Sequence, residues 1–152
     1  MPGVDWGMES YKRGSHTVWD CKYHLVWVTK YRYQVLGGDV GQRCRELLRE
    51  TARAHEMVVH AGSINRDHVH MLLSIPPKYA VAQVVGYLKG KSAIHLARTY
   101  GGRQQNFVGE HFWARGYFVT TVGHDEEAVR RYIRAQEAED RRLEQLELFK
   151  KK

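Results

Sequence analysis

Two histidines separated by one residue, His68 and His70, are the side chains best suited to chemistry in this sequence. The residues before them are typical of a turn, and the residues from 68 to 75 fit a β-strand, in which successive side chains point to opposite faces. One face of that strand is uniformly apolar: Val69, Met71, Leu73 and Ile75. The two imidazoles share the other face, where they can hold one metal ion between them. An apolar strand folds without such a pair, so the pair indicates a function.

A tyrosine and a glutamine near the C-terminus add two more reactive groups. Val129, Tyr132, Ile133 and Gln136 have the spacing of one helical face, on which Tyr132 and Gln136 are neighbours at i and i+4. If this face lies over the histidines, a phenol, an amide oxygen and two imidazoles converge. A metal ion held by the two histidines and Gln136 would polarise a phosphodiester while Tyr132 attacks it as nucleophile.

Each of these groups also has a simpler interpretation. A tyrosine on the apolar face of a helix usually packs, and a glutamine beside it usually lies at the rim. An alternating histidine pair occurs in many strands by chance, or it binds a zinc ion with a structural role. The combination of fold order, paired histidines, tyrosine and glutamine favours the catalytic interpretation.

The elements that position these residues follow from periodicity. Alternation predicts strands over 17–29, 57–64, 68–75 and 117–122, and the short turn after residue 64 predicts an antiparallel hairpin. Helical spacing predicts helices from Asp39, as N-cap, to about residue 55, over 80–100 and over 126–148. The order β-α-β-β-α-β plus one helix is that of an α+β, ferredoxin-like antiparallel sheet with two helices on one face.

The face of the sheet that carries the histidines needs a cover. The first two helices are expected to cover the apolar face of strand 68–75. The other face carries His68 and His70 together with His24, Val26 and Val28 of the first strand. The C-terminal helix is the remaining element that can cover it, from the same chain or from a partner.

Length and charge restrict the kind of protein. The 152 residues suit a single domain over 1–152, with residues 141–152 as a flexible tail.

The net charge restricts the kind of partner. Lys and Arg exceed Asp and Glu by 24 to 17, which gives a net charge of +7. Such a charge suits binding to a nucleic acid or to an acidic membrane surface, but it is also found in proteins that are merely soluble. No apolar run approaches the roughly 20 residues of a membrane helix, and residues 1–12 do not resemble a secretory signal. We expect a cytoplasmic protein.

Two basic segments are candidates for phosphate contact. Lys30 and Arg32 alternate with tyrosines in a loop, as in surfaces that bind single strands, although an ordinary exposed loop has the same composition. Lys89 and Lys91 flank Gly90, either as a solvated helix face or as an edge that follows phosphates. A second glycine lies one turn earlier at Gly86, and close approach of another backbone, of protein or DNA, would explain the two glycines.

Five blocks of sequence carry a resemblance to a known family. The sequence resembles the TnpA-type HUH transposases, small single-tyrosine enzymes of insertion sequences that move as single-stranded DNA. The match spans roughly residues 17 to 137, without departure at the key positions. The blocks are Tyr23–Arg32, Asp67–His70, Leu88–Ser92, Phe112–Phe118 and Tyr132–Gln136.

The resemblance implies a mechanism and partners. His68, His70 and Gln136 would bind Mg²⁺ or Mn²⁺, and Tyr132 would cleave one DNA strand, forming a 5′-phosphotyrosine link and a free 3′-OH. The link would later be rejoined to another 3′-OH without ATP. Family members are homodimers that recognise DNA hairpins at the ends of the element, and the tyrosine helix of one protomer can serve the histidines of the other. The cationic residues assigned to DNA contact are Lys30, Arg32, Lys89, Lys91 and Arg115.

Two alternatives share much of this sequence pattern. A domesticated HUH relative, acting on chromosomal hairpins or at a replication origin, would have the same site and another substrate. A non-catalytic hairpin-binding module would bind DNA and never form a covalent adduct.

Overall fold

The computed structural model describes residues 12–13, 16–101, 112–123 and 125–150, with side chains for 16–101, 112–123 and 125–142. Four strands form an antiparallel sheet in the spatial order β4-β5-β3-β6. Its strands are β3 (Lys22–Val28), β4 (Val58–Ile64), β5 (His68–Ser74) and β6 (Phe118–Val122). The helices are α1 (Gly38–Ala54), α2 (Val81–Tyr100) and α3 (Glu126–Lys150). This order confirms the predicted α+β fold with its additional C-terminal helix.

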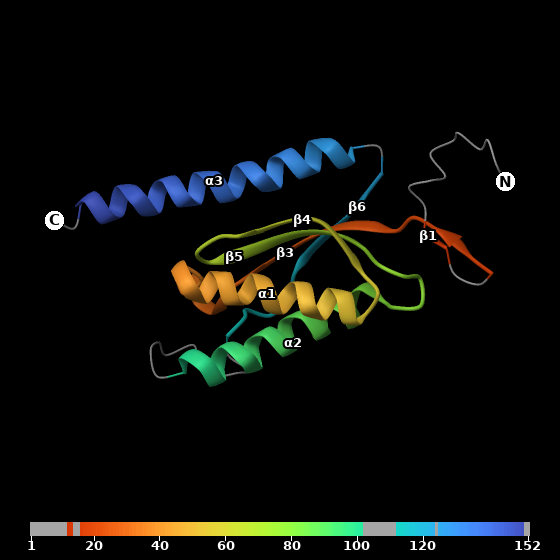
Figure 1. The fold of residues 1–152 in the computed structure, drawn as a ribbon, viewed down its shortest axis with the longest axis horizontal. Helices are drawn as coiled ribbons and strands as arrows, with labels where there is room; N and C mark the ends of the chain where they lie inside the picture. The colour runs from red at the N-terminus through yellow and green to blue at the C-terminus, as the bar shows by residue number, and fades with distance from the viewer. Residues whose placement is uncertain (1–11, 14–15, 102–111, 124, 151–152) are drawn as a thin grey trace.

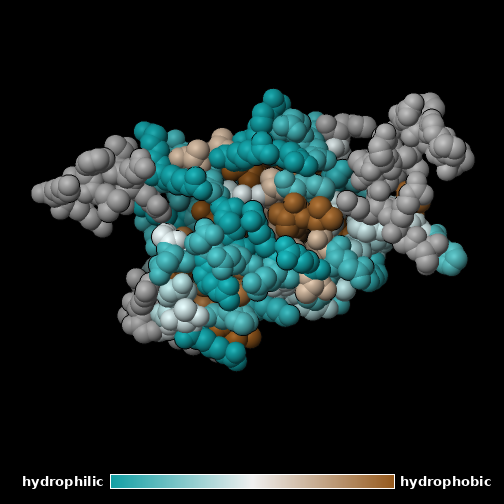
Figure 2. All heavy atoms as spheres, in the orientation of Figure 1, coloured by the Kyte–Doolittle hydropathy of each residue, from teal (hydrophilic) through white to brown (hydrophobic). Residues whose placement is uncertain are grey.

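The sheet lies between two helical layers. Figure 1 shows α1 and α2 together on one face of the sheet and α3 alone on the other. The side of the molecule seen in that view is mostly hydrophilic, with an apolar area in the gap between α3 and the α1 layer (Figure 2). No helix in the described ranges is both long enough and apolar enough to cross a membrane.

The main core lies between the sheet and the layer of α1 and α2. The predicted apolar face of β5, together with Ile75 just after it, is buried there, and Leu25 and Trp27 of β3 lie beside it. Complete burial of one large apolar side chain stabilises the fold by about 1.5–3 kcal/mol, so this layer dominates stability. The helical residues that complete it are Val40, Cys44, Leu47, Leu48 and Ala52 of α1 and Val84, Val85, Leu88, Ala93 and Leu96 of α2.

A smaller core holds α3 on the opposite face. Ile133 of α3 is fully buried against Leu72 of β5 and Val122 of β6, and Val129 and Ala61 pack at its margin. The C-terminal helix therefore covers the histidine face of its own chain, which is one of the two arrangements expected from the sequence.

Two element boundaries differ from the sequence prediction. The strand predicted over 17–29 is divided, because Val18–Trp19 (β2) pairs with Lys12–Arg13 (β1) in a separate ladder and the chain changes partner before β3 begins at Lys22. Asp39 is not the N-cap of α1: Gly37 occupies that position and Asp39 lies in the first turn. Gly38 has a φ of +58°, a left-handed conformation that favours glycine, so the helix can start earlier than its acidic residue suggested.

The glycines of α2 have no close neighbour. A Cβ atom added at Gly86 or Gly90 would meet no heavy atom within 4 Å in the described part of the chain. Close packing against another segment of this described chain is therefore not their role, and the approach of DNA stays a prediction.

Candidate active site

The first residues of β5 bring His68 and His70 together on the α3 face of the sheet. Their ring centroids are 5.0 Å apart and the rings are nearly perpendicular. Val28 and Val26 of β3 lie opposite them in the antiparallel register. His70 is 5% exposed, and its strand lies between β3 and β4 in the sheet. The strand alternation predicted from sequence is confirmed.

The Nδ1 atom of His68 is fixed by the carboxylate of Asp67. The distance from this nitrogen to Oδ1 of Asp67 is 2.6 Å, and the other carboxylate oxygen accepts a hydrogen bond from Nε of Arg32 at 3.0 Å. Burial alone would raise the pKa of Asp67, but the hydrogen bonds and charges of His68 and Arg32 outweigh it and lower the pKa. The carboxylate is therefore ionised near neutral pH and can accept the Nδ1 proton of His68.

The Nδ1 atom of His70 faces another histidine. It lies 3.1 Å from Nε2 of His24, whose ring is 8% exposed. Burial, reinforced by the neighbouring His68 and His24, lowers the pKa of His70 to about 4, and burial also lowers the pKa of His24. Both rings are therefore neutral near pH 7, so a single proton lies between the two nitrogens. If His70 carries it, the Nε2 lone pair of His70 points away from the hydrogen bond.

Tyr132 reaches this cluster from α3. Its ring centroid is 5.7 Å from that of His70 and 6.2 Å from that of His24, edge-on to both. The side chain is 50% exposed, so one part of the ring contacts the histidines and another faces solvent. The structure thus brings together the tyrosine and the histidines that the sequence singled out, within one chain.

Gln136 lies one turn after Tyr132 and is half-buried. Its backbone oxygen accepts a hydrogen bond from Nδ2 of Asn65 at 2.9 Å, while its side chain makes no hydrogen bond within the described ranges. Those ranges contain no group of three His, Cys, Asp or Glu side chains arranged for a metal ion. A site built on His68 and His70 therefore needs a further oxygen donor, and the amide of Gln136 is of the right kind.

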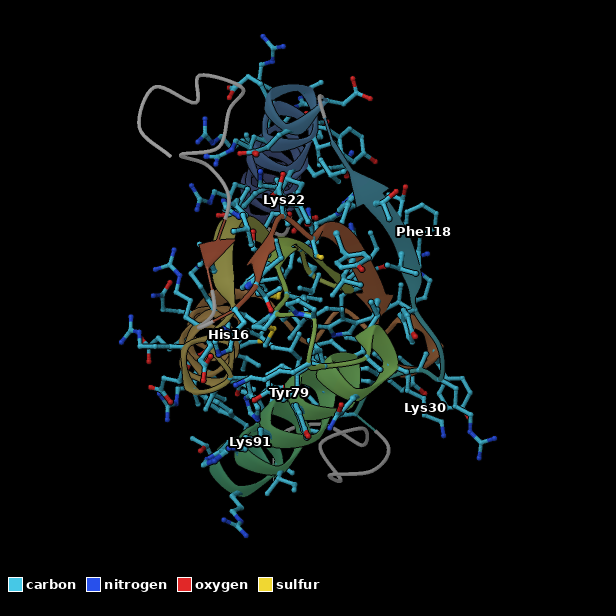
Figure 3. The ribbon with its side chains drawn as sticks, turned by 90° about the vertical axis from the view of Figure 1, so that its right-hand side faces the viewer. His16, Lys22, Lys30, Tyr79, Lys91 and Phe118 are labelled. Carbon is cyan, nitrogen blue, oxygen red and sulfur yellow. The ribbon has the colours of Figure 1, made fainter. Side chains whose placement is uncertain are left out.

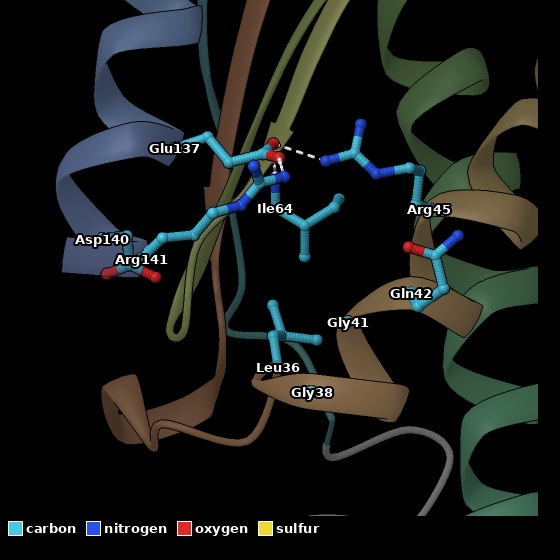
Figure 4. Close-up of a pocket in the computed structure, with 9 residues that line it drawn as sticks. All are labelled: Leu36, Gly38, Gly41, Gln42, Arg45, Ile64, Glu137, Asp140 and Arg141. Atoms are coloured by element: carbon cyan, nitrogen blue, oxygen red, sulfur yellow. Dashed lines mark hydrogen bonds and ion pairs between the residues drawn. The ribbon is translucent and has the colours of Figure 1, made fainter. Parts of the chain in front are cut away.

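Two carboxylates of α3 hold the helix over the site. Glu137 accepts hydrogen bonds from the backbone nitrogen of Ile64, at 3.2 Å, and from Arg45 of α1. Asp140 accepts one from the backbone nitrogen of Arg66, at 2.9 Å. Figure 4 shows Glu137 and Asp140 facing the pocket between α3 and α1, with Arg45 on the opposite wall.

The start of α3 is held by a third carboxylate. Glu126 pairs with Lys22 of β3 at 2.9 Å and with Arg130 on its own helix at 2.6 Å. Figure 3 shows Lys22 beneath this helix.

The cations assigned to DNA contact do not form one patch. Arg32 binds Asp67, on the histidine side, whereas Lys91 lies on α2 in the layer opposite α3 (Figure 3). Nζ of Lys89 donates to the backbone oxygens of Ala114 and Gly116, at 2.7 and 3.1 Å, and burial lowers its pKa. Lys89 thus has a structural role that the sequence did not reveal.

Arg115, on the loop that Lys89 holds, is exposed, and Lys30 is half-buried. Contact of any of these five cations with DNA stays a prediction.

Comparison with known proteins decides the family. A family model described as "Transposase IS200 like" matches residues 17–136. The transposase of insertion sequence element IS200 from Salmonella typhimurium is 38% identical over 141 residues, 93% of each protein. This chain belongs to the IS200-like transposase family.

Further relatives agree with this assignment. The ISDra2 transposase TnpA of Deinococcus radiodurans is 35% identical over 126 residues, covering 82% of this chain and 90% of that protein. A crystal structure of a protein assigned as a transposase from Deinococcus radiodurans R1 superposes with a TM-score of 0.67 at 33% identity, over 82% of this chain and 97% of that one.

A more distant structure shares the fold of this IS200-like transposase. It is a REP-associated tyrosine transposase bound to a REP hairpin, with a TM-score of 0.57 and 13% identity, over 80% of this chain and 69% of that one. Because the chain belongs to this transposase family, it belongs to a class of enzymes that cleave and join DNA.

Sequence reasoning missed two residues of this transposase's site. His24 and Asp67 both lie in blocks that carry the family resemblance, but the sequence analysis assigns neither of them a role in the site. A signal was available for both. His24 shares the strand face of the histidines by alternation, and Asp67 directly precedes His68.

Proposed function

We propose that this IS200-like transposase cleaves and rejoins single-stranded DNA through Tyr132. The observation that supports this most directly is the position of the Tyr132 ring, edge-on to His70 and half exposed to solvent. If the Tyr132 ring served packing alone, we would expect it to be buried in the small core around Ile133, the next residue of the helix, whose side chain faces the sheet.

The hydrogen bonds of the two histidines would orient both side chains for metal binding. Asp67 and His24 each provide an acceptor for an Nδ1 proton, which leaves the Nε2 lone pairs of His68 and His70 available. With the amide oxygen of Gln136 they would bind Mg²⁺ or Mn²⁺. Such an ion, when bound, polarises the phosphodiester and favours the ionised phenol.

The covalent step exchanges one phosphoester for another. Oη of Tyr132 attacks the phosphorus and loses its proton, while the bond from phosphorus to the 3′-oxygen breaks. That oxygen leaves as a 3′-OH after gaining a proton, and the 5′-phosphate stays on Tyr132. Because the number of phosphoester bonds is unchanged, a different 3′-OH can reverse the step without ATP.

The partners are proposed on the same basis. The structural neighbour is described as bound to a hairpin, and this chain has a net charge of +7, so we propose that it recognises DNA hairpins at the ends of its element. We further propose a homodimer in which α3 of one protomer can serve the histidines of the other.

Covalent trapping tests the reaction. The protein is incubated with labelled single-stranded DNA containing the element ends, with Mn²⁺ or with EDTA, and denatured before electrophoresis. A metal-dependent adduct is expected for the wild type and for the control Tyr117→Phe, which changes an exposed tyrosine before β6. Tyr132→Phe should bind DNA and form no adduct. Tight binding without an adduct in the wild type would instead establish a hairpin-binding module.

A further inference from the structure

Phe118 is a large apolar side chain exposed at the active site. It is 57% exposed and opens β6, the outer strand of the sheet. Its register partner is Val26 of β3, which in turn lies opposite His70, so Phe118 is on the sheet face of the histidines. Its ring meets the ring of His24 edge-on, with centroids 6.2 Å apart. Figure 3 shows it at this outer edge, below α3.

The chain before Phe118 is held firmly. Trp113 forms a β-bridge with Thr29 and donates from Nε1 to Oγ of Ser92 at 3.0 Å. The next residue, Ala114, donates its backbone N–H to the oxygen of Val28 at 3.0 Å. Lys89 then binds the backbone oxygens of Ala114 and Gly116, as described above, and Gly116 has a φ of +84° that favours glycine. The strand is thus fixed in place while the ring that it carries remains largely uncovered.

Folding does not account for a phenylalanine at this position. The small core beneath α3 is closed by Val122 at the other end of β6, and Phe118 is not part of it. Phe118 and Tyr132 each meet His24 edge-on, so the two rings border one surface around the histidines. A DNA strand that brings its phosphate to Tyr132 would bring a neighbouring base within reach of this surface.

From this arrangement, and resting on the function proposed above, we infer that Phe118 is a stacking surface for the nucleobase next to the phosphate attacked by Tyr132. An aromatic ring binds any base through its π-face, so it adds affinity without selecting a sequence. Phe118 thereby holds the strand close to the site, while recognition of the hairpin is left to other residues.

Binding to a defined probe tests this inference. Fluorescein-labelled dT15 is titrated at constant salt with protein carrying Tyr132→Phe, so that no cleavage occurs, and anisotropy reports the Kd. Adding Phe118→Ala should weaken binding by about 5- to 150-fold, the range for loss of one base–aromatic stack. Phe118→Trp should restore it. Val119→Ala is the matched control, because Val119 is 40% exposed on the opposite face of the same strand, and it should leave the Kd unchanged.

A second readout locates the contact. Single-stranded DNA containing 5-iododeoxyuridine should photocrosslink to Phe118, and mass spectrometry of the digested adduct identifies the residue. Unchanged affinity in Phe118→Ala, or equal losses in Phe118→Ala and Val119→Ala, would overturn the inference. So would a change of oligomeric state in Phe118→Ala with DNA affinity intact, since the ring would then contact a second copy of the chain.

The outcome is separable from that of the proposed function. If the wild type forms no covalent adduct but Phe118→Ala still weakens binding, cleavage through Tyr132 is wrong, while base stacking on Phe118 is supported without the link to an attacked phosphate. If the adduct forms and Phe118→Ala binds dT15 like its parent, the stacking surface alone is wrong.

Discussion

His24 and His70 share a buried hydrogen bond of 3.1 Å between Nε2 of the first ring and Nδ1 of the second. Both pKa values are lowered by burial, so the contact is between neutral imidazoles. Asp67 makes the equivalent contact with His68. The two proposed metal ligands therefore have different supports: a carboxylate for His68 and a neutral ring for His70. Metal-binding histidines commonly depend on such supports for their tautomer and ring orientation.

His24 should therefore be a positioning residue for the metal. Replacing it in His24→Phe removes the acceptor for the Nδ1 proton of His70, and we expect Mn²⁺ affinity to fall by about 10- to 100-fold. His24→Gln, whose amide oxygen can accept the same proton, should restore most of it. Calorimetric titration with Mn²⁺ measures this without any DNA. Equal affinities in the Phe and Gln variants would show that the hydrogen bond has no role.

Stability of the metal-free protein should decrease on acidification through His70. The unfolded histidine binds a proton below about pH 6.5, whereas the folded one does so only near its pKa of about 4. The unfolded state thus binds more protons between these values, and stability falls as pH falls. The expected loss between pH 7 and pH 5 is about 2 kcal/mol.

The His70 effect can be separated from that of carboxylates. Asp67 and Glu126 have lowered pKa values, so the stability that they contribute is lost at more acidic pH. Urea unfolding in EDTA at pH 7 and pH 5 should show a smaller pH dependence for His70→Gln than for the wild type. The same pH dependence in both proteins would contradict the assignment.

The parts of this structure that sequence predicted are those governed by periodicity. Alternation in β5 and helical spacing in α1, α2 and α3 follow from burial of one face of each element, which leaves a pattern in a single sequence. The convergence of Tyr132 with His70 was predicted because the uncovered sheet face had one remaining element to cover it.

The parts that sequence did not predict depend on contacts between distant residues. Lys89 was predicted from sequence only as a phosphate contact, whereas the fold also brings the backbone oxygens of Ala114 and Gly116 to its ammonium group. Arg32 lies 35 positions from Asp67, and nothing in either segment marks the other as its partner. The division of the strand predicted over 17–29 likewise depends on pairing with β1.

Glu137 should hold α3 in place over the histidines. Glu137→Gln removes the charge that pairs with Arg45 and weakens the contact with the backbone of Ile64, at an expected cost of about 1–3 kcal/mol. Because these contacts tie α3 to α1 and β4, amide hydrogen exchange in α3 should become faster. Glu139→Gln is the matched control, since Glu139 pairs with Arg142 on the exposed side of the same helix. Similar exchange in the two variants would show that Ile133 and its apolar neighbours suffice to hold the helix.

The chain that supplies the tyrosine can be determined by mixing two inactive proteins. In this structure α3 covers the histidines of its own chain, whereas the proposed dimer allows it to serve the partner. Tyr132→Phe retains intact histidines, and His68→Ala retains an intact tyrosine. Random mixing makes half of the dimers heterodimers. If the tyrosine of one protomer acts with the histidines of the other, one of the two sites in each heterodimer is competent. Roughly a quarter of the wild-type number of sites is then competent. Covalent adduct formation should therefore return to about that level in the mixture, while each protein alone stays inactive. No recovery after verified subunit exchange would show that each chain uses its own Tyr132, as the position of α3 here permits.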